Sequence, residues 1–259
     1  MQCYDVVVVG SGNVAEAFAC SLAGCEGVKL CQVYARNEER GRAIAQMCSC
    51  EWSCSEVAAA DLYIIAVSDR AVESVAASLV VPEEAVIMHT AGSVPMSAIP
   101  ERGGRRGIIY PLQSFSKGRE ISLADVPLFI EADSDKAKET IKDLAQRISS
   151  CVEYATSERR RYIHLAGVFV NNFVNHMYTL GRDVVAEADL PFDVLKPLIR
   201  ETAAKAIATE NPHGVQTGPA VRGDRVVVER HMKMLEADSL KERIYKDITD
   251  SIWETSKRI

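Results

Sequence analysis

The chain has 259 residues, 47% of them hydrophobic and 25% charged, which is the composition of a globular protein with one large domain or two smaller ones. Its net charge of -6 at pH 7 argues against a nucleic-acid ligand, because binding to phosphates needs a basic surface. No window approaches the roughly 18 apolar residues of a membrane span, and the N-terminus runs into a strand-like segment without a signal sequence. We therefore expect a cytoplasmic protein that binds neither nucleic acid nor membranes.

The first half of the chain alternates short β-branched runs with helical patterns, which is typical of a parallel sheet covered by helices. The first run, YDVVVVG at 4–10, has the continuous apolar character of a strand buried on both faces. The predicted strands are 4–10, 29–35, 61–67, 84–90, 107–112, 127–132 and 151–155, and the predicted helices are 13–23, 38–48 and 134–148. This order predicts an α/β fold, a doubly wound, mostly parallel Rossmann-type sheet, over residues 1–156.

Strand-like runs stop after about residue 157, and the rest of the sequence has helical patterns only. We expect helices at about 157–187, 192–210, 224–236 and 239–257, with a Pro/Gly-rich break at 211–224. The ERRR patch at 158–161 is interpreted as a solvated helix start. Residues 157–259 are therefore predicted to form an all-α domain.

Seven of the eight cysteines lie in the first 54 residues, three of them in CSCEWSC at 48–54. This segment lacks the paired C-x-x-C spacing of structural zinc sites. We interpret the cysteines as reduced thiols that pack as small hydrophobic side chains, with a metal site as the less favoured alternative. No metal-binding histidine motif occurs, so no catalytic metal is predicted.

The sequence GSGNVA follows the first predicted strand and opens the first predicted helix, which is the context of a dinucleotide-binding motif. Gly10 allows a tight turn, Gly12 lets the backbone approach a pyrophosphate, and Ala15 permits close packing of the helix on the strand. Asn13 and Val14 begin the helix, whose N-terminus offers free N–H groups to phosphates.

The end of the second predicted strand carries Arg36 and Asn37, where domains that prefer NAD place an acid on the ribose 2′-hydroxyl. An arginine gains a charge-assisted hydrogen bond only from a 2′-phosphate. The cofactor is therefore expected to be NADP(H), with NAD less favoured. As an alternative, Arg36 is a solvated loop residue paired with Glu38 or Glu39.

Two more loops leave the carboxyl ends of predicted strands, where ligands bind in such sheets. The candidate contacts are Val67, Ser68 and Asp69 for the adenosine and ribose, Thr90 and Gly92 for the nicotinamide, and His89 and Ser93 for the substrate. The position of Asp69 also fits a helix N-cap.

The segment HLAGVFVNNFVNH at 164–176 interrupts an apolar helix with polar residues, which cost stability unless they find partners. On a regular helical wheel one polar stripe contains His164, Asn171, Asn175 and, further round, Tyr178, whereas Asn172 and His176 lie off it. We expect His164 to act as the acid or base and Asn171 and Asn175 to contact substrate or nicotinamide. The alternative is that the asparagines only hydrogen-bond across a helix pair.

The sequence TGPAVRGD closes the Pro/Gly-rich break. Thr217 begins a rigid turn, and Arg222 offers a guanidinium fork that suits a carboxylate or a phosphate. These two are candidate substrate residues, and Asp224 is a candidate cap of the following helix. A pair between Arg222 and Asp224 is the structural alternative.

The motifs VVVVGSGNVA, HTAGSVP, YPLQSFS, HLAGVFVNNFVNHMY and TGPAVRGD together resemble a bacterial family of Rossmann-like proteins whose helical second domain has no known function. That family is related to pyrroline-5-carboxylate reductases, deazaflavin-dependent NADP oxidoreductases and the 6-phosphogluconate and 3-hydroxyisobutyrate dehydrogenases. The resemblance implies that NADP(H) binds to the first domain and a small substrate binds in the cleft. Gln113 and Ser114, in the YPLQSFS motif, join the candidate substrate residues. The resemblance also implies a homodimer formed through the helical domain.

The chain departs from this pattern at Tyr110, because related dehydrogenases often carry His-Pro in the loop where it has Tyr-Pro. A tyrosine is a poor base at neutral pH. Two functions follow from the sequence: an NADP(H)-dependent oxidoreductase that acts on a small carbonyl or imine, or a nucleotide-binding sensor or scaffold that keeps the Rossmann shell without turnover.

Overall fold

The structure is a computed structural model that describes residues 3–119 and 122–257. It separates into two compact units, residues 1–172 and residues 173–259. The division falls inside the helical segment with which the sequence predicts the second domain to begin.

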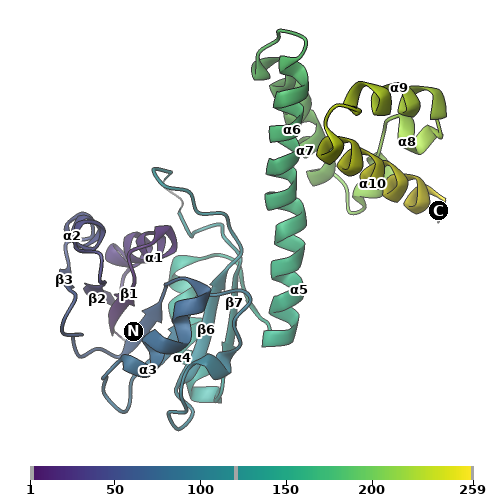
Figure 1. Cartoon of the computed structure of the whole chain (residues 1–259). Helices are drawn as coiled ribbons and strands as arrows, with labels where there is room; N and C mark the ends of the chain where they lie inside the picture. Colours follow the sequence, from purple (N-terminus) through teal and green to yellow (C-terminus); the bar gives the residue numbers. More distant parts are fainter. Residues whose placement is uncertain (1–2, 120–121, 258–259) are drawn as a thin grey trace. The chain divides into compact units, whose positions relative to one another are not determined.

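An eight-stranded sheet forms the centre of the first unit (Figure 1), in the order β3-β2-β1-β4-β5-β6-β7-β8. Among the described strands, neighbours run parallel except β6 and β7, which are antiparallel. The strands are β1 (Tyr4–Val9), β2 (Val28–Tyr34), β3 (Glu51–Ser53), β4 (Leu62–Ile65), β5 (Val86–His89), β6 (Arg106–Pro111), β7 (Leu128–Ala132) and β8 (Val152–Tyr154).

Helices cover both faces of this sheet. The helices of the first unit are α1 (Asn13–Ala23), α2 (Glu38–Met47), α3 (Val72–Ser78), α4 (Asp135–Ile148) and α5 (Ser157–Gly167). Since successive side chains of a strand point to opposite faces, Val6 and Val8 pack with α1, α2 and α4, whereas Val7 and Val9 pack on the side of α3. All four valines are at most 2% exposed. The predicted doubly wound sheet is thereby confirmed.

One strand and one α-helix of the first unit were not predicted. The strand β3 is only three residues long, too short for a hydrophobic period, and it is held by its pairing with β2 and by the Trp52 indole N–H, which donates to the Ala35 carbonyl at 3.2 Å. The helix α3 is short, and only two of its residues, Val72 and Ala76, are buried. Its sequence therefore shows little hydrophobic periodicity.

The second unit is helical throughout its regular structure, as predicted. It contains α6 (Val174–Ala186), α7 (Lys196–Ile207), α8 (Pro219–Arg222), α9 (Arg225–Leu235) and α10 (Ser239–Ser256), with 3-10 turns at Phe192–Leu195 and Pro212–Val215. Asp224 caps α9, because its side chain accepts the Val227 N–H at 3.2 Å. No helix of the described residues is both long and apolar enough to cross a membrane.

The regular wheel expected for 157–187 is wrong in one respect. Between α5 and α6 the helix takes the π form over Val168–Phe173, so its hydrogen bonds skip one residue more than in an α-helix. The angular phase between His164 and Asn175 therefore differs from that of a regular helix. Asn171 and Asn172 lie within the π segment itself, and both are exposed.

Candidate functional site

A groove of about 870 Å³ opens at the carboxyl ends of β1, β2 and β4. Its lining includes eight of the predicted cofactor residues, namely Gly10, Gly12, Asn13, Val14, Arg36, Asn37, Val67 and Ser68. The loops that carry them are far apart in the sequence but meet because parallel strands end at one edge of the sheet. Sequence reasoning missed Phe115, whose side chain also lines the groove from the loop after β6.

The glycine loop has the shape that a pyrophosphate needs. Gly10 has φ +131°, and a Cβ at this position would collide with the Ala66 carbonyl, so only glycine fits. A Cβ at Gly12, in contrast, would meet no protein atom within 4 Å. Gly12 caps α1 without a side-chain hydrogen bond, which leaves the first N–H groups of this 11-residue helix available to an anion.

Arg36 lies on the groove with an exposed side chain. It makes no hydrogen bond or ion pair within the described chain, and Glu38, one of its possible partners, is paired instead with Arg42 at 2.9 Å. The guanidinium is therefore free to bind an anion. The Asn37 side chain accepts the Arg40 N–H at 2.9 Å, so Asn37 caps α2 at the edge of the groove.

Arg40 is a second arginine beside the glycine loop, and sequence reasoning missed it. Its guanidinium donates to the Ser11 carbonyl at 3.0 Å, to Asn13 Oδ1 at 3.3 Å and to Glu16 Oε2 at 2.8 Å. The Asn13 amide in turn donates to the Phe115 carbonyl at 3.0 Å. These bonds fix the loop from the side of α2, and the only sequence signal was the ERGR run that follows Arg36.

A second group of predicted residues meets at the loop after β5. Tyr110, at the end of β6, and His164, on α5, approach each other there, with the hydroxyl oxygen 3.4 Å from Nδ1. Gly92 makes this approach possible, because a Cβ at Gly92 would lie 2.8 Å from His164 Nδ1 and from the Tyr110 ring. Burial raises the pKa of Tyr110, so its hydroxyl stays protonated at neutral pH and can donate to the imidazole.

The same loop is tied to the loop after β4. The Ser93 hydroxyl donates to a carboxylate oxygen of Asp69. Asp69 is therefore not an N-cap: the helical turn that it opens is preceded by Ser68, and no side-chain cap bond is made there. Thr90 is buried, and its hydroxyl donates to the Ile65 carbonyl at 3.4 Å. Neither Asp69 nor Thr90 lines the groove.

His89 is placed as a support of the loop. Its side chain is fully buried; Nδ1 accepts the Ala91 N–H at 3.2 Å and Nε2 lies 3.4 Å from the Pro95 carbonyl. Burial, and then the positive charge of Arg160, lower the pKa of His89 to about 4, so the ring is neutral at physiological pH. We interpret the role of His89 as structural. Because its side chain has no exposed surface, it cannot make the predicted contact with substrate in this structure.

Arg160 corrects the interpretation of ERRR as a solvated helix start. Its side chain is 1% exposed, and it donates to Glu131 Oε2 at 2.6 Å and to the Val94 carbonyl at 2.6 Å. The Ser157 hydroxyl donates to the same carboxylate oxygen at 2.7 Å. This network joins α5, which carries His164, to β7 and to the loop after β5. A charged run cannot reveal which of its members points inward.

The remaining predicted substrate residues are exposed in the unit to which each belongs. Gln113 and Ser114 are exposed after β6, and Gln113 Oε1 accepts the Ser114 N–H at 2.7 Å. Asn175, Thr217 and Arg222 belong to the second unit, where all three are exposed. The structure shows no ion pair between Arg222 and Asp224 within the described residues, so this structural alternative is not supported.

No group of three or more His, Cys, Asp or Glu side chains in the described ranges could hold a metal ion. All eight cysteines are free.

Two family profiles match the chain. Residues 5–92 match a family described as NADP oxidoreductase, coenzyme F420-dependent, and residues 126–252 match a domain of unknown function (DUF2520). No curated protein matches the chain.

Solved structures match over nearly the whole length. A "putative NADP oxidoreductase" from Bacteroides fragilis is 39% identical, with a TM-score of 0.86 over 97% of this chain and 98% of that chain. An imine reductase from Streptomyces aurantiacus (14% identity, TM-score 0.68, coverage 98% and 95%) and a pyrroline-5-carboxylate reductase from Coxiella burnetii (15%, 0.55, 99% and 98%) share the fold. The chain therefore belongs to the family of the Bacteroides fragilis protein, in which a domain of the coenzyme F420-dependent NADP oxidoreductase type precedes the domain of unknown function.

Proposed function

We propose that this protein is an NADP(H)-dependent oxidoreductase that transfers a hydride to or from a small carbonyl or imine compound. The observation that carries the proposal is the unpaired Arg36 guanidinium on the groove that also contains the open glycine loop. Membership of a family of the NADP oxidoreductase type supports the same assignment.

The groove suits NADP(H) in three respects. The open space at Gly12 and the free N-terminus of α1 are suited to the pyrophosphate, and Arg36 is suited to the 2′-phosphate. Val67 and Ser68 line the same groove on the side of β4. When bound, the nicotinamide supplies or accepts the hydride.

The pair of Tyr110 and His164 is proposed to handle the proton that accompanies the hydride. With its hydroxyl protonated, Tyr110 donates to Nδ1 of His164, which places the ring proton of the neutral imidazole on Nε2. That N–H can hydrogen-bond to a carbonyl oxygen or an imine nitrogen; as its proton passes to the substrate, the Tyr110 hydroxyl proton passes to Nδ1, so the imidazole stays neutral and Tyr110 regains a proton from solvent. Tyr110 thus fixes the tautomer and orientation of His164, a role that does not require a low pKa.

The substrate class rests on fold relatives and on the polar residues of the helical segment. An imine reductase and a pyrroline-5-carboxylate reductase share the fold, and both names denote reduction of a carbon–nitrogen double bond. Asn171 and Asn175 are proposed to orient the substrate, and Thr217 and Arg222 to bind an acidic group on it.

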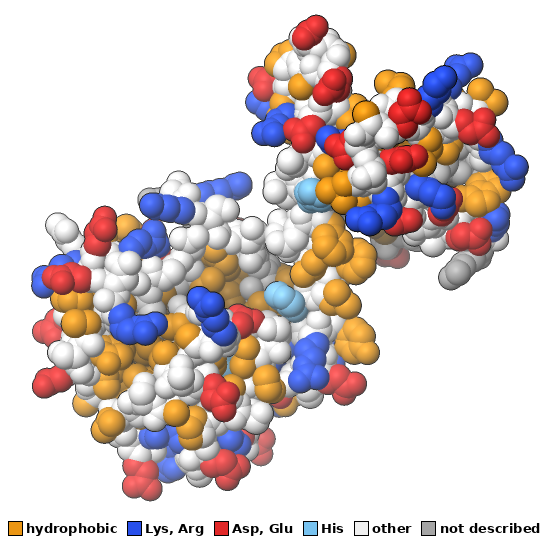
Figure 2. All heavy atoms as spheres, viewed as in Figure 1, with side chains coloured by type: hydrophobic (Ala, Val, Ile, Leu, Met, Phe, Trp, Pro, Cys, Tyr) orange, Lys and Arg blue, Asp and Glu red, His pale blue; other side chains and the backbone are white. Residues whose placement is uncertain are grey.

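We also propose that the helical unit forms a homodimer. Within residues 173–257, Ala220 is the one apolar side chain that is buried, while Leu198, Ile207 and Met234 are 64%, 86% and 76% exposed. Figure 2 shows apolar side chains spread over this part of the surface. A second copy would cover such faces.

Calorimetric titration of NADPH and NADH into the wild type and the Arg36→Ala variant tests the cofactor assignment. Loss of a charge-assisted bond to the 2′-phosphate should weaken NADPH binding roughly 10- to 100-fold and leave NADH nearly unchanged. Arg42→Ala is a matched control, because Arg42 is an exposed arginine of α2, the helix that follows Arg36, and is already paired with Glu38. Equal losses for both cofactors would remove the argument for NADP.

Turnover is tested by following NADPH oxidation with keto acids, aldehydes, cyclic imines and a 5-deazaflavin. The His164→Ala variant should keep cofactor affinity and lose most of the rate, and Tyr110→Phe should lower the rate less. A wild type that binds NADPH without oxidising it with any of these compounds would favour the sensor or scaffold function instead.

A further inference from the structure

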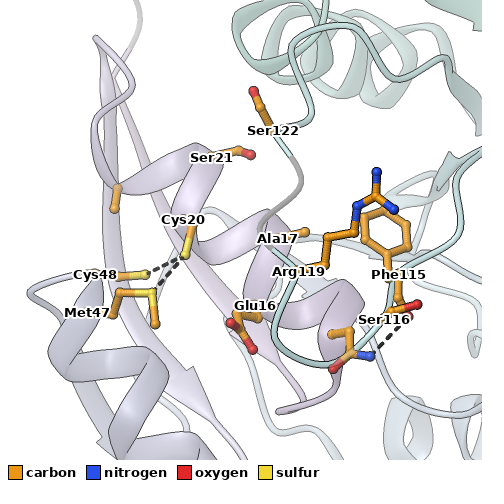
Figure 3. Close-up of a pocket in the computed structure, with 12 residues that line it drawn as sticks. Glu16, Ala17, Cys20, Ser21, Met47, Cys48, Phe115, Ser116, Arg119 and Ser122 are labelled. Carbon is orange, nitrogen blue, oxygen red and sulfur yellow. Dashed lines mark hydrogen bonds between the residues drawn. The ribbon is translucent and has the colours of Figure 1, made fainter.

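Three sulfur atoms from α1 and from the C-terminal end of α2 meet at one pocket. Cys20 lies on α1, Met47 is the last residue of α2, and Cys48 follows it. The Cys20 thiol donates to Met47 Sδ at 3.5 Å, and the sulfurs of Cys20 and Cys48 are 3.7 Å apart. Figure 3 shows the three sulfur-bearing side chains turned toward one another at one side of a pocket.

This sulfur cluster is accessible from outside and backed by protein. The pocket has a volume of about 420 Å³. Cys48 is only 7% exposed, whereas Met47 is 57% exposed and Cys20 is exposed. Glu16 lines the same pocket one helical turn before Cys20, and its carboxylate is paired with Arg40 at 2.8 Å.

The 3.7 Å between the sulfurs of Cys20 and Cys48 suits two ligands of one ion, and the 3.5 Å between the sulfurs of Cys20 and Met47 is slightly shorter. With metal–thiolate bonds of about 2.3 Å, sulfur ligands of a three- or four-coordinate ion lie roughly 3.7–4.0 Å apart. A disulfide, by comparison, needs about 2.05 Å between its sulfurs, so its formation would require Cys20 and Cys48 to move together. It would also leave the thioether of Met47 without a role.

We propose that Cys20, Met47 and Cys48 form a binding site for a soft monovalent metal ion, Cu⁺ or Ag⁺. Thiolate and thioether ligands select such ions over harder ones. The ion forms two bonds to thiolates and one to the thioether, the two S–H protons leave to solvent, and no group is oxidised or reduced. The bound ion then links α1 to the end of α2. This proposal does not depend on the proposed function.

The test is an anaerobic titration of the reduced, full-length protein with Cu⁺ in competition with a coloured Cu⁺ chelator. Cys20→Ser, Met47→Leu and Cys48→Ala should each weaken the tightest equivalent at least about tenfold. Cys54→Ser and Met234→Leu are matched controls, because they remove an exposed thiol and an exposed thioether outside the cluster. Identical Cu⁺ affinities of the wild type and the Cys20→Ser and Met47→Leu variants would overturn the proposal.

Two further measurements keep the proposal falsifiable if Cys48→Ala does not fold. X-ray absorption of the protein with one equivalent of Cu⁺ should show three sulfur neighbours in the wild type and two after Met47→Leu. One equivalent of Ag⁺ should raise the melting temperature of the wild type but not that of Cys20→Ser. Tighter binding of Zn²⁺ than of Ag⁺, or only nitrogen and oxygen neighbours around Cu⁺, would contradict a soft-metal site.

Discussion

In the first unit the apolar side chains of the central strands are fully buried on both faces of the sheet, whereas residues 173–257 bury only Ala220. The polar contacts differ in the same way. The Arg160–Glu131 pair of the first unit is 1% and 10% exposed, while the Lys246–Asp250 pair of the second is 61% exposed on both sides. The first unit therefore has a buried core of its own, whereas the apolar side chains of the second unit remain largely in contact with solvent.

This difference explains where defined geometry is found. The glycine loop, the Tyr110–His164 contact and the loop after β5 are all fixed by buried neighbours of the first unit. In the second unit, α8 packs near α10, where Gly223 adopts φ +64° and a Cβ would lie 2.9 Å from Trp253. Such local contacts order a turn but do not form a core.

The largest expected effect comes from breaking the buried ion pair. Arg160→Met leaves the Glu131 carboxylate without its cation, and removing one partner of a buried pair costs about 3–5 kcal/mol. Urea unfolding measures it, with Trp52 reporting on the first unit in a Trp253→Phe background. Lys246→Met, which breaks an exposed pair of similar length in the second unit and is followed by Trp253 in a Trp52→Phe background, should cost under about 1 kcal/mol. Similar costs for the two variants would mean that burial does not separate the units.

A smaller effect is expected from the pH dependence of His89. The pKa of His89 is lowered to about 4 in the folded protein, whereas in the unfolded chain it is near 6.5. Between pH 6.5 and pH 4 the unfolded chain therefore binds a proton at His89 that the folded protein does not bind. The stability contributed by the neutral ring is complete above pH 6.5 and is lost as the pH falls toward 4, by roughly 3 kcal/mol at most.

The measurement compares the free energy of unfolding of the wild type and His89→Gln from pH 7.5 to 4. Subtracting the two curves removes the carboxylate contributions that both proteins share. The wild type should lose more stability than the variant across this window. Parallel curves would show that His89 is not held neutral by its surroundings.

Much of the fold could be predicted because its signals are local. The apolar run of β1, the glycine turn at Gly10 and the caps of the later helices each act within a few residues. The inward direction of Arg160 could not be predicted, because its partners Glu131 and Val94 are 29 and 66 residues away along the chain. The π segment was missed for a related reason, since apolar periodicity does not reveal where a helix changes its hydrogen-bond register.

The smallest expected effect on unfolding comes from changing one exposed apolar side chain in each unit. Leu198 in α7 is 64% exposed and Val80 in the first unit is 87% exposed, so either residue changed to Asp should alter the unfolding of a single chain by no more than about 0.5 kcal/mol. If the helical unit forms a homodimer, Leu198→Asp weakens the dimer and Val80→Asp does not. A Leu side chain buried between two copies contributes about 1.5–3 kcal/mol.

Sedimentation over a range of concentrations reads this out directly. The wild type and Val80→Asp should sediment with twice the 28.4 kDa mass of the chain, and Leu198→Asp should shift toward a single chain on dilution. If Leu198→Asp stays dimeric, Ile207→Asp, which changes a more exposed residue of the same helix, tests the opposite face of α7. A wild type that sediments as a single chain at every concentration would refute the homodimer, and the exposed apolar side chains of the second unit would then need another partner.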